Sequence, residues 1–66
     1  MVNVNKKLVE YSKGMTVSDA LKLADEAVGS MIIVMVDRRV VSNSDLNITK
    51  INDNTQISTF QLVSGG

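Results

Sequence analysis

The sequence predicts a small α+β fold, in which a mixed sheet of four to five strands packs against one helix. Three observations lead to this prediction: a length of 66 residues, one segment with helical periodicity and several short segments with strand periodicity. A chain of this length forms one domain at most, and it buries only about 60% of the surface that the unfolded chain exposes. Because 44% of the residues are hydrophobic and 21% are charged, the chain is apolar enough to fold.

The first residues have the pattern of a β-hairpin. Val2 and Val4 alternate with asparagines, which is the period of a half-buried strand. A tight turn is expected at residues 5–7, because Asn5 tolerates a positive φ, although Lys6 is a poor second residue for such a turn. Residues 8–12 are expected to form the returning strand.

One segment has the pattern of an amphipathic helix of roughly three turns. Thr16 is placed to cap its N-terminus, and Asp19 at the third helical position completes a capping box. Gly29 stands where a left-handed residue would end the helix. The apolar stripe consists of Val17, Leu21, Ala24 and Val28.

Two strands are expected after the helix. Residues 31–36 are apolar at both odd and even positions, which predicts a strand covered on both faces or nearly so. A turn is expected at residues 37–39, and Val40 and Val41 form a short further strand.

A long polar connection precedes the last strand. Residues 42–55 are rich in polar side chains, and three apolar residues are expected to hold this segment to the core: Leu46, Ile48 and Ile51. Asp53 and Asn54 predict a turn that leads into a strand over residues 56–63.

The order of these elements outlines a β-grasp domain. A single helix covers only one face of a sheet, so the other face is expected to be open to solvent. The predicted division is a β-grasp domain over residues 1–63 and a flexible Gly-Gly tail over residues 64–66.

The composition excludes most catalytic chemistry. Without His or Cys there is no ordinary zinc site, thiol nucleophile, imidazole base or disulfide. The formal net charge of zero argues against nucleic-acid binding, which depends on phosphate neutralisation. The longest apolar run, residues 31–36, is far short of the ~20 residues that a membrane span needs, and the first residues have no apolar signal-peptide core. We therefore expect a cytoplasmic protein with no nucleic-acid or membrane partner.

Several motifs together resemble a known family. The most specific is the final heptapeptide, residues 60–66, and three weaker ones precede it: Val4-Asn5, Gly14-Met15-Thr16-Val17, and Met35-Val36-Asp37 with Val40-Val41. In this order they resemble the ThiS family of ubiquitin-like sulfur carriers over essentially the whole chain. The sequence departs from the family pattern at positions where a Gly, a Pro, an Asp-Gly-Asp turn and an acidic residue are common: Lys6, Ser42, Asp53-Asn54-Thr55 and Ser58-Thr59.

The resemblance implies a carrier, acted on by partner enzymes, rather than an enzyme. In the family, a ubiquitin-activating-type enzyme uses ATP and Mg²⁺ to adenylate the terminal carboxylate, here that of Gly66. A sulfur donor such as a cysteine desulfurase then converts it to a thiocarboxylate, and thiazole synthase or another acceptor takes the sulfur in thiamin biosynthesis. No cofactor is expected on the chain itself. Gly65 and Ser64 form the tail, and a chain without Cβ atoms can thread a narrow channel.

The alternation of the last strand identifies a candidate partner-binding surface. If Ile57 points into the core, Phe60 and Leu62 point to the open face, close to the tail. An exposed aromatic side chain beside a reactive terminus is a reasonable anchor for a partner. In the alternative, a bulge near Ser58 and Thr59 resets the register and returns Phe60 to the core.

Other functions remain open at this point. The small subunit of molybdopterin synthase uses the same chemistry, but its members are usually longer and tend to carry Pro-Pro before their final residues, whereas this chain has no Pro. A ubiquitin-like modifier would join Gly66 to a target lysine, and a ubiquitin-like interaction module or a regulatory β-grasp domain would use no terminal chemistry.

Overall fold

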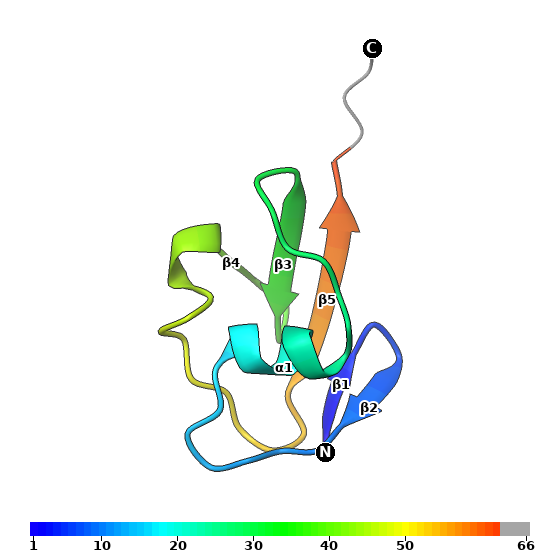
Figure 1. Ribbon diagram of the computed structural model, residues 1–66, viewed down its shortest axis with the longest axis vertical. Helices are drawn as coiled ribbons and strands as arrows, with labels where there is room; N and C mark the ends of the chain where they lie inside the picture. The colour runs from blue at the N-terminus through cyan, green and yellow to red at the C-terminus, as the bar shows by residue number, and fades with distance from the viewer. Residues whose placement is uncertain (63–66) are drawn as a thin grey trace.

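The computed structural model describes residues 1–62, which form a five-stranded sheet, one α-helix and one short 3₁₀ helix. The elements along the chain are β1 (Val2–Val4), β2 (Lys7–Val9), α1 (Val17–Leu23), β3 (Ile32–Val36), β4 (Arg39–Val41), η1 (Asn43–Asp45) and β5 (Gln56–Gln61). The strand order is β2-β1-β5-β3-β4, so the last strand lies in the middle of the sheet (Figure 1). β1 and β5 are parallel and the other neighbours are antiparallel, which confirms the predicted mixed sheet.

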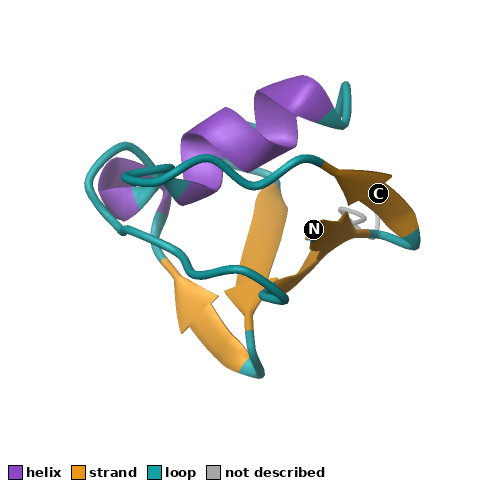
Figure 2. Cartoon of the chain, turned by 90° about the horizontal axis from the view of Figure 1, so that it is seen from below, coloured by secondary structure: helices purple, strands orange, loops and turns teal. Residues whose placement is uncertain are grey.

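The core lies between α1 and one face of the sheet. Figure 2 shows the helix on one side of the strands. The largest fully buried side chains come from both layers: Val2, Val4, Val17, Leu21, Val34 and Ile57. Because a single short helix supplies the second layer, this core is small, and the opposite face of the sheet is left open.

The start of α1 agrees with the sequence pattern. The Oγ1 atom of Thr16 accepts a hydrogen bond from the backbone N–H of Asp19 at 3.3 Å. In return, Oδ2 of Asp19 accepts the N–H of Thr16 at 3.1 Å. These two bonds complete the predicted capping box. The bond that the backbone N–H of Thr16 donates to the Asp19 carboxylate is the main cause that holds the pKa of this carboxyl below its usual value.

The end of α1 differs from the sequence prediction. The helix ends at Leu23, with Ala24 as its C-cap, so it is shorter than three turns. Asp25, rather than Gly29, takes the left-handed conformation with φ 57°. The prediction that Val28 belongs to the buried stripe is also wrong, because Val28 is 54% exposed.

Hydrogen bonds at the end of α1 explain why it stops there. The N–H groups of Asp25 and Glu26 donate to the carbonyls of Lys22 and Leu21, at 3.1 and 2.9 Å, as in a Schellman motif. Nζ of Lys7, from β2, donates to the carbonyl of Ala24 at 3.0 Å and lies 3.1 Å from a carboxylate oxygen of Glu26. Lys7, which is distant in sequence, therefore supplies a hydrogen-bond donor to a free carbonyl at the helix end. No local sequence pattern could predict this contact.

The strand β3 is covered on one face only, which differs from the prediction of a strand covered on both faces or nearly so. Val34 is buried against the helix side, whereas the other residues of β3 are half-buried and Met31 before it is exposed. The described residues provide no second layer over the other face. The continuous apolar run therefore reflects a partly exposed surface and not a doubly buried strand.

The connection between β4 and β5 is held to the core by two of the three expected residues. Leu46 and Ile51 are buried, but Ile48 is 70% exposed. Ile48 lies in the turn that follows η1, where its N–H donates to the carbonyl of Asp45 at 3.1 Å and its side chain faces outward. The same segment supplies carbonyls of Leu46 and Thr49 to the first N–H groups of α1.

Both predicted hairpin turns contain two residues instead of three. Asn5 and Lys6 have φ values of 50° and 72°, and the residue pair Asp37-Arg38 has φ values of 48° and 72°. Two successive positive φ values are typical of type I′ turns, which match the twist of the flanking strands. Lys7 and Arg39 therefore begin the returning strands, and β2 ends at Val9 rather than at residue 12.

Candidate functional site

The predicted site residues lie at the end of β5, directly after it, and in the tail. Gly66, Gly65 and Ser64, which carry the predicted chemistry, lie outside the described residues, as does Val63, the predicted end of the last strand. Phe60 and Leu62, the predicted partner-binding residues, are described. The structure can therefore test the predicted surface around Phe60 and Leu62.

Alternation along β5 sends two apolar side chains in opposite directions. Ile57 is 1% exposed and packs in the core, whereas Phe60 is 52% exposed on the open face. The pairing of β5 with β3 runs without interruption from Val36↔Ile57 to Ile32↔Gln61. No bulge interrupts this pairing, so the alternative in which Phe60 returns to the core is wrong.

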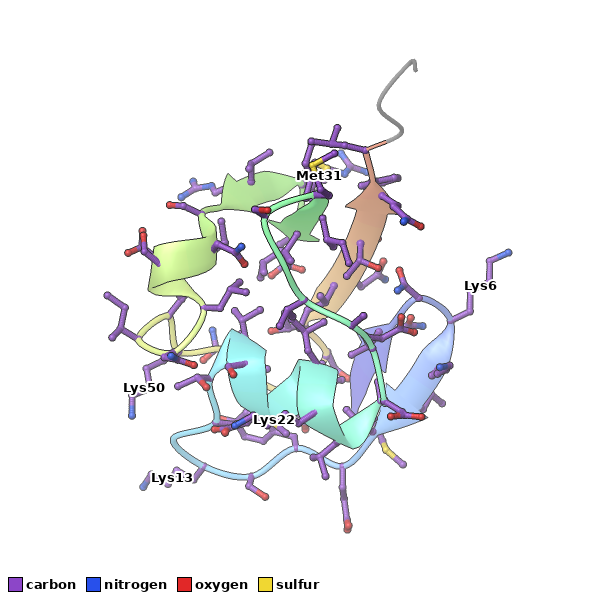
Figure 3. All side chains as sticks on the ribbon, turned by 45° about the horizontal axis from the view of Figure 1, so that its top comes forward. Lys6, Lys13, Lys22, Met31 and Lys50 are labelled. Carbon is purple, nitrogen blue, oxygen red and sulfur yellow. The ribbon has the colours of Figure 1, made fainter. Side chains whose placement is uncertain are left out.

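Leu62 follows β5 and is also exposed. Its N–H donates to the carbonyl of Met31 at 2.7 Å, which extends the contact with the β3 side by one residue beyond the strand. Met31 lies beside the end of β5 (Figure 3). The last described residue is thus still attached to the sheet by its backbone.

Phe60 belongs to a larger apolar surface on the open face. It pairs across the sheet with Ile33, and Met35 pairs with Val40 on the next strand. These four residues, Phe60, Ile33, Met35 and Val40, form what we call the open-face patch. Sequence reasoning missed three of them. For Ile33 and Met35 the signal was the apolar run over residues 31–36, which was interpreted as a strand covered on both faces or nearly so.

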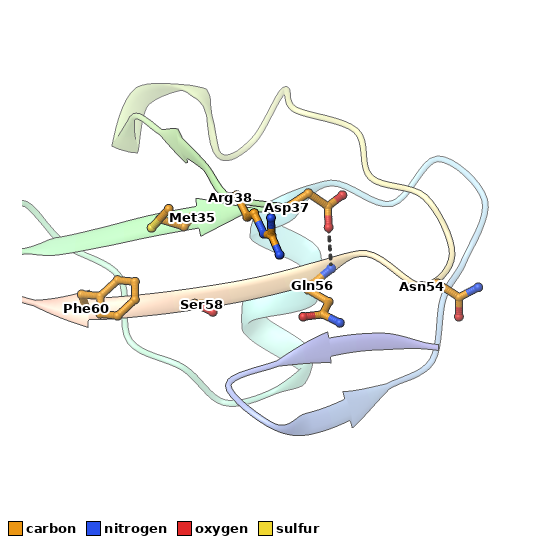
Figure 4. A pocket seen from close by; sticks show the side chains of 7 residues that line it. All are labelled: Met35, Asp37, Arg38, Asn54, Gln56, Ser58 and Phe60. Atoms are coloured by element: carbon orange, nitrogen blue, oxygen red, sulfur yellow. Dashed lines mark hydrogen bonds between the residues drawn. The ribbon is translucent and has the colours of Figure 1, made fainter.

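A hollow of ≈470 Å³ adjoins the patch (Figure 4). Its lining consists of Met35, Asp37, Arg38, Asn54, Gln56, Ser58 and Phe60. The apolar side chains of Met35 and Phe60 lie at one end and polar and charged groups lie at the other. Oδ1 of Asp37 accepts the backbone N–H of Gln56 at 3.0 Å, which ties the β3–β4 turn to the start of β5.

The described residues carry little chemistry of their own. Over residues 1–62, no group of three or more acidic, His or Cys residues could hold a metal ion. In the same part of the chain, neither helix has the length and apolar character needed to cross a lipid bilayer. The pKa of Glu26 is held below its usual value, chiefly by the side chain of Lys7, whose Nζ atom lies 3.1 Å from the carboxylate.

Comparisons with known proteins agree on the fold. The structure is similar to the crystal structure of a thiamine biosynthesis protein, ThiS, from Geobacter metallireducens, with a TM-score of 0.76 and 18% identity over 98% of this chain and 97% of that chain. This likeness confirms the β-grasp fold. A search of curated proteins finds no match. A family model described as "ThiS family" matches residues 2–66. Because that match covers nearly the whole sequence, the chain belongs to the ThiS family.

Proposed function

We propose that this chain is a sulfur carrier of thiamin biosynthesis and that the carboxylate of Gly66 is its reactive group. The single observation that carries the proposal is the family match, which extends over residues 2–66 and so includes Ser64, Gly65 and Gly66. The name of the similar structure, a thiamine biosynthesis protein, supports the choice of pathway.

The proposed chemistry has two steps, and partner enzymes catalyse both. A carboxylate oxygen of Gly66 attacks the α-phosphate of ATP, and pyrophosphate leaves to give an acyl-adenylate. Hydrosulfide then attacks the acyl carbon, and AMP leaves to give a thiocarboxylate. Where a cysteine desulfurase supplies the sulfur as an enzyme persulfide, the attack gives an acyl disulfide, and a thiol reductant then cleaves its S–S bond to release the thiocarboxylate. A ubiquitin-activating-type enzyme would supply Mg²⁺ and align the reacting groups, so that the carrier needs no catalytic side chain.

We further propose that the open-face patch docks the adenylating enzyme. Placing the tail in an active site costs conformational entropy, which a contact elsewhere must offset. Full burial of a Phe side chain contributes roughly 1.5–3 kcal/mol, and Phe60 still has half of its surface to bury. Only residues 61–65 separate Phe60 from Gly66, so a partner that holds the patch also holds the tail close to its catalytic groups.

Intact-mass measurement tests the proposal directly. The protein is incubated with ATP, Mg²⁺, sulfide and an adenylating enzyme of the ubiquitin-activating type, beside a variant that lacks Gly66. We expect the mass to change by the replacement of one oxygen with one sulfur, and the shortened variant to stay unmodified. Attachment to a lysine of another protein would instead identify a modifier, and an unchanged mass with several such enzymes would contradict a carrier role.

Delivery of the sulfur tests the pathway. The thiocarboxylated protein is offered to thiazole synthase with its other substrates, and formation of the thiazole product is followed by mass spectrometry. We expect product that contains the carrier's sulfur. Transfer to a molybdopterin precursor, with none to thiazole, would place the carrier in the other pathway.

A further inference from the structure

The pairing of β1 with β5 ends before β5 does. Asn3 pairs with Gln56 and Val4 pairs with Ile57, and the chain then turns at Asn5, which has φ 50°. The backbone N–H of Asn5 donates to the carbonyl of Ile57 at 3.0 Å, the last ladder bond from this strand. In a continued parallel ladder the next bond would come from the N–H of Thr59.

The side chain of Asn5 takes the place of that missing ladder bond. Its Oδ1 atom accepts the backbone N–H of Thr59 at 2.9 Å. Its Nδ2 group donates to Oγ1 of Thr59 at 2.7 Å. We call this pair of bonds the Asn5–Thr59 clamp. Both residues are half-buried, and their bonds span 54 positions of sequence.

The clamp acts where β5 has a strand neighbour on one side only. From Thr59 to Gln61, β5 pairs with β3, while its pairing with β1 has already ended. Thr59 directly precedes Phe60, so the clamp fixes the backbone of β5 next to the residue that this strand contributes to the open-face patch.

We propose that Asn5 and Thr59 are positioning residues that hold the end of β5, and with it Phe60, in the direction needed for docking. This inference rests on the proposed carrier function. Asn suits the position for two reasons. It tolerates the positive φ of the turn, and its amide offers both an acceptor and a donor.

Three variants distinguish the effect of losing the Asn5–Thr59 bonds from the effect of changing the turn at residues 5 and 6. Asn5→Gly keeps the positive φ but removes both bonds. Asn5→Asp keeps an acceptor for the Thr59 N–H, and the Thr59 hydroxyl can turn to donate to the other carboxylate oxygen, so the clamp is retained. Thr59→Val removes only the bond to Oγ1. Lys6→Gly is the matched control, because it changes the same turn, at a residue whose side chain is exposed, without touching the clamp (Figure 3).

Two measurements test the proposal. Hydrogen exchange followed by NMR should show exchange of the residue 59 amide that is about tenfold faster in Asn5→Gly, as expected for loss of one hydrogen bond, with no change at Val34 in the core. Steady-state adenylation should show a KM for the carrier that is about tenfold higher, with kcat within about twofold, because docking and not chemistry is impaired. Asn5→Asp should restore both values, and Thr59→Val should fall between.

The outcomes distinguish the clamp from the carrier role. Wild-type exchange at residue 59 and wild-type KM in Asn5→Gly would overturn the inference. A loss of kcat alone, or equal changes in Lys6→Gly, would also overturn it. If the wild-type protein is not adenylated at all, the proposed function fails, while the exchange measurement still decides whether the clamp holds β5.

Discussion

The two faces of the sheet differ in what covers them, and β5 contributes to both. On the helix side, Ile57 is 1% exposed and packs with Leu21 and Val34 in the core. On the open side, three residues later, Phe60 is 52% exposed. The covered face stabilises the fold by burying its side chains, whereas the open face keeps apolar surface exposed. Substitutions on the two faces should therefore have different effects.

The largest expected effect is on the covered face. Replacing Ile57 with Ala should cost about 2–5 kcal/mol, since it leaves a cavity in a fully packed core. A domain of this size has only ~3–5 kcal/mol of stability, so the variant should be largely unfolded at room temperature. Urea denaturation followed by circular dichroism measures the loss. Ile57→Val, the milder control, should cost about 0.5–1.5 kcal/mol. A wild-type midpoint for Ile57→Ala would contradict the core assignment.

The open face should show the reverse pattern. Phe60→Ala should change the free energy of unfolding by less than about 1 kcal/mol, because half of the side chain already contacts water. It should raise the KM for the adenylating enzyme about tenfold, the effect typical of an interface anchor. Ile48→Ala, which truncates an exposed residue outside the sheet, should leave that KM unchanged. If Phe60→Ala lost much of the free energy of unfolding but kept a normal KM, Phe60 would stabilise the fold and would not serve as a docking residue.

The stability of α1, which packs on the covered face, depends on its N-cap residue, Thr16. Thr16→Ala should lower the free energy of unfolding by about 1 kcal/mol, because the N–H of Asp19 loses its acceptor. Thr16→Ser should recover most of that loss. Thermal melts measure both variants, and adenylation kinetics should be normal in each. If Thr16→Ala and the wild type melt together, the capping box contributes no stability.

The smallest expected effect is the response to acid. The pKa values of Asp19 and Glu26 are lowered in the folded state, so both groups bind protons more readily when the chain is unfolded. Their contribution is present above the usual pKa values of Asp and Glu, and it is lost as the pH falls below these through the lower values of the folded state. Thermal melts at successively lower pH should show a falling Tm, with a shallower fall in Glu26→Gln. A Tm that rises on acidification would contradict the sign.

Local patterns in the sequence predicted much of this fold. The capping box at Thr16 depends on residues three positions apart, and the exposure of Phe60 follows from alternation with Ile57. The end of α1 could not be predicted in this way, because Lys7 reaches its last carbonyl from another element.

The candidate site also depends on contacts between elements that are distant in sequence. The number of layers over a sheet is a property of the whole fold, so the apolar run over residues 31–36 could not by itself distinguish a doubly buried strand from one with an open face. The bonds between Asn5 and Thr59 join residues 54 positions apart, beyond the reach of any periodicity.

The central place of the last strand has a consequence for how the protein is made. β5 lies between β1 and β3, so a nascent chain on the ribosome cannot close the sheet until its final strand has been synthesised. Folding therefore depends on contacts between the two ends of the chain, which form slowly compared with local ones.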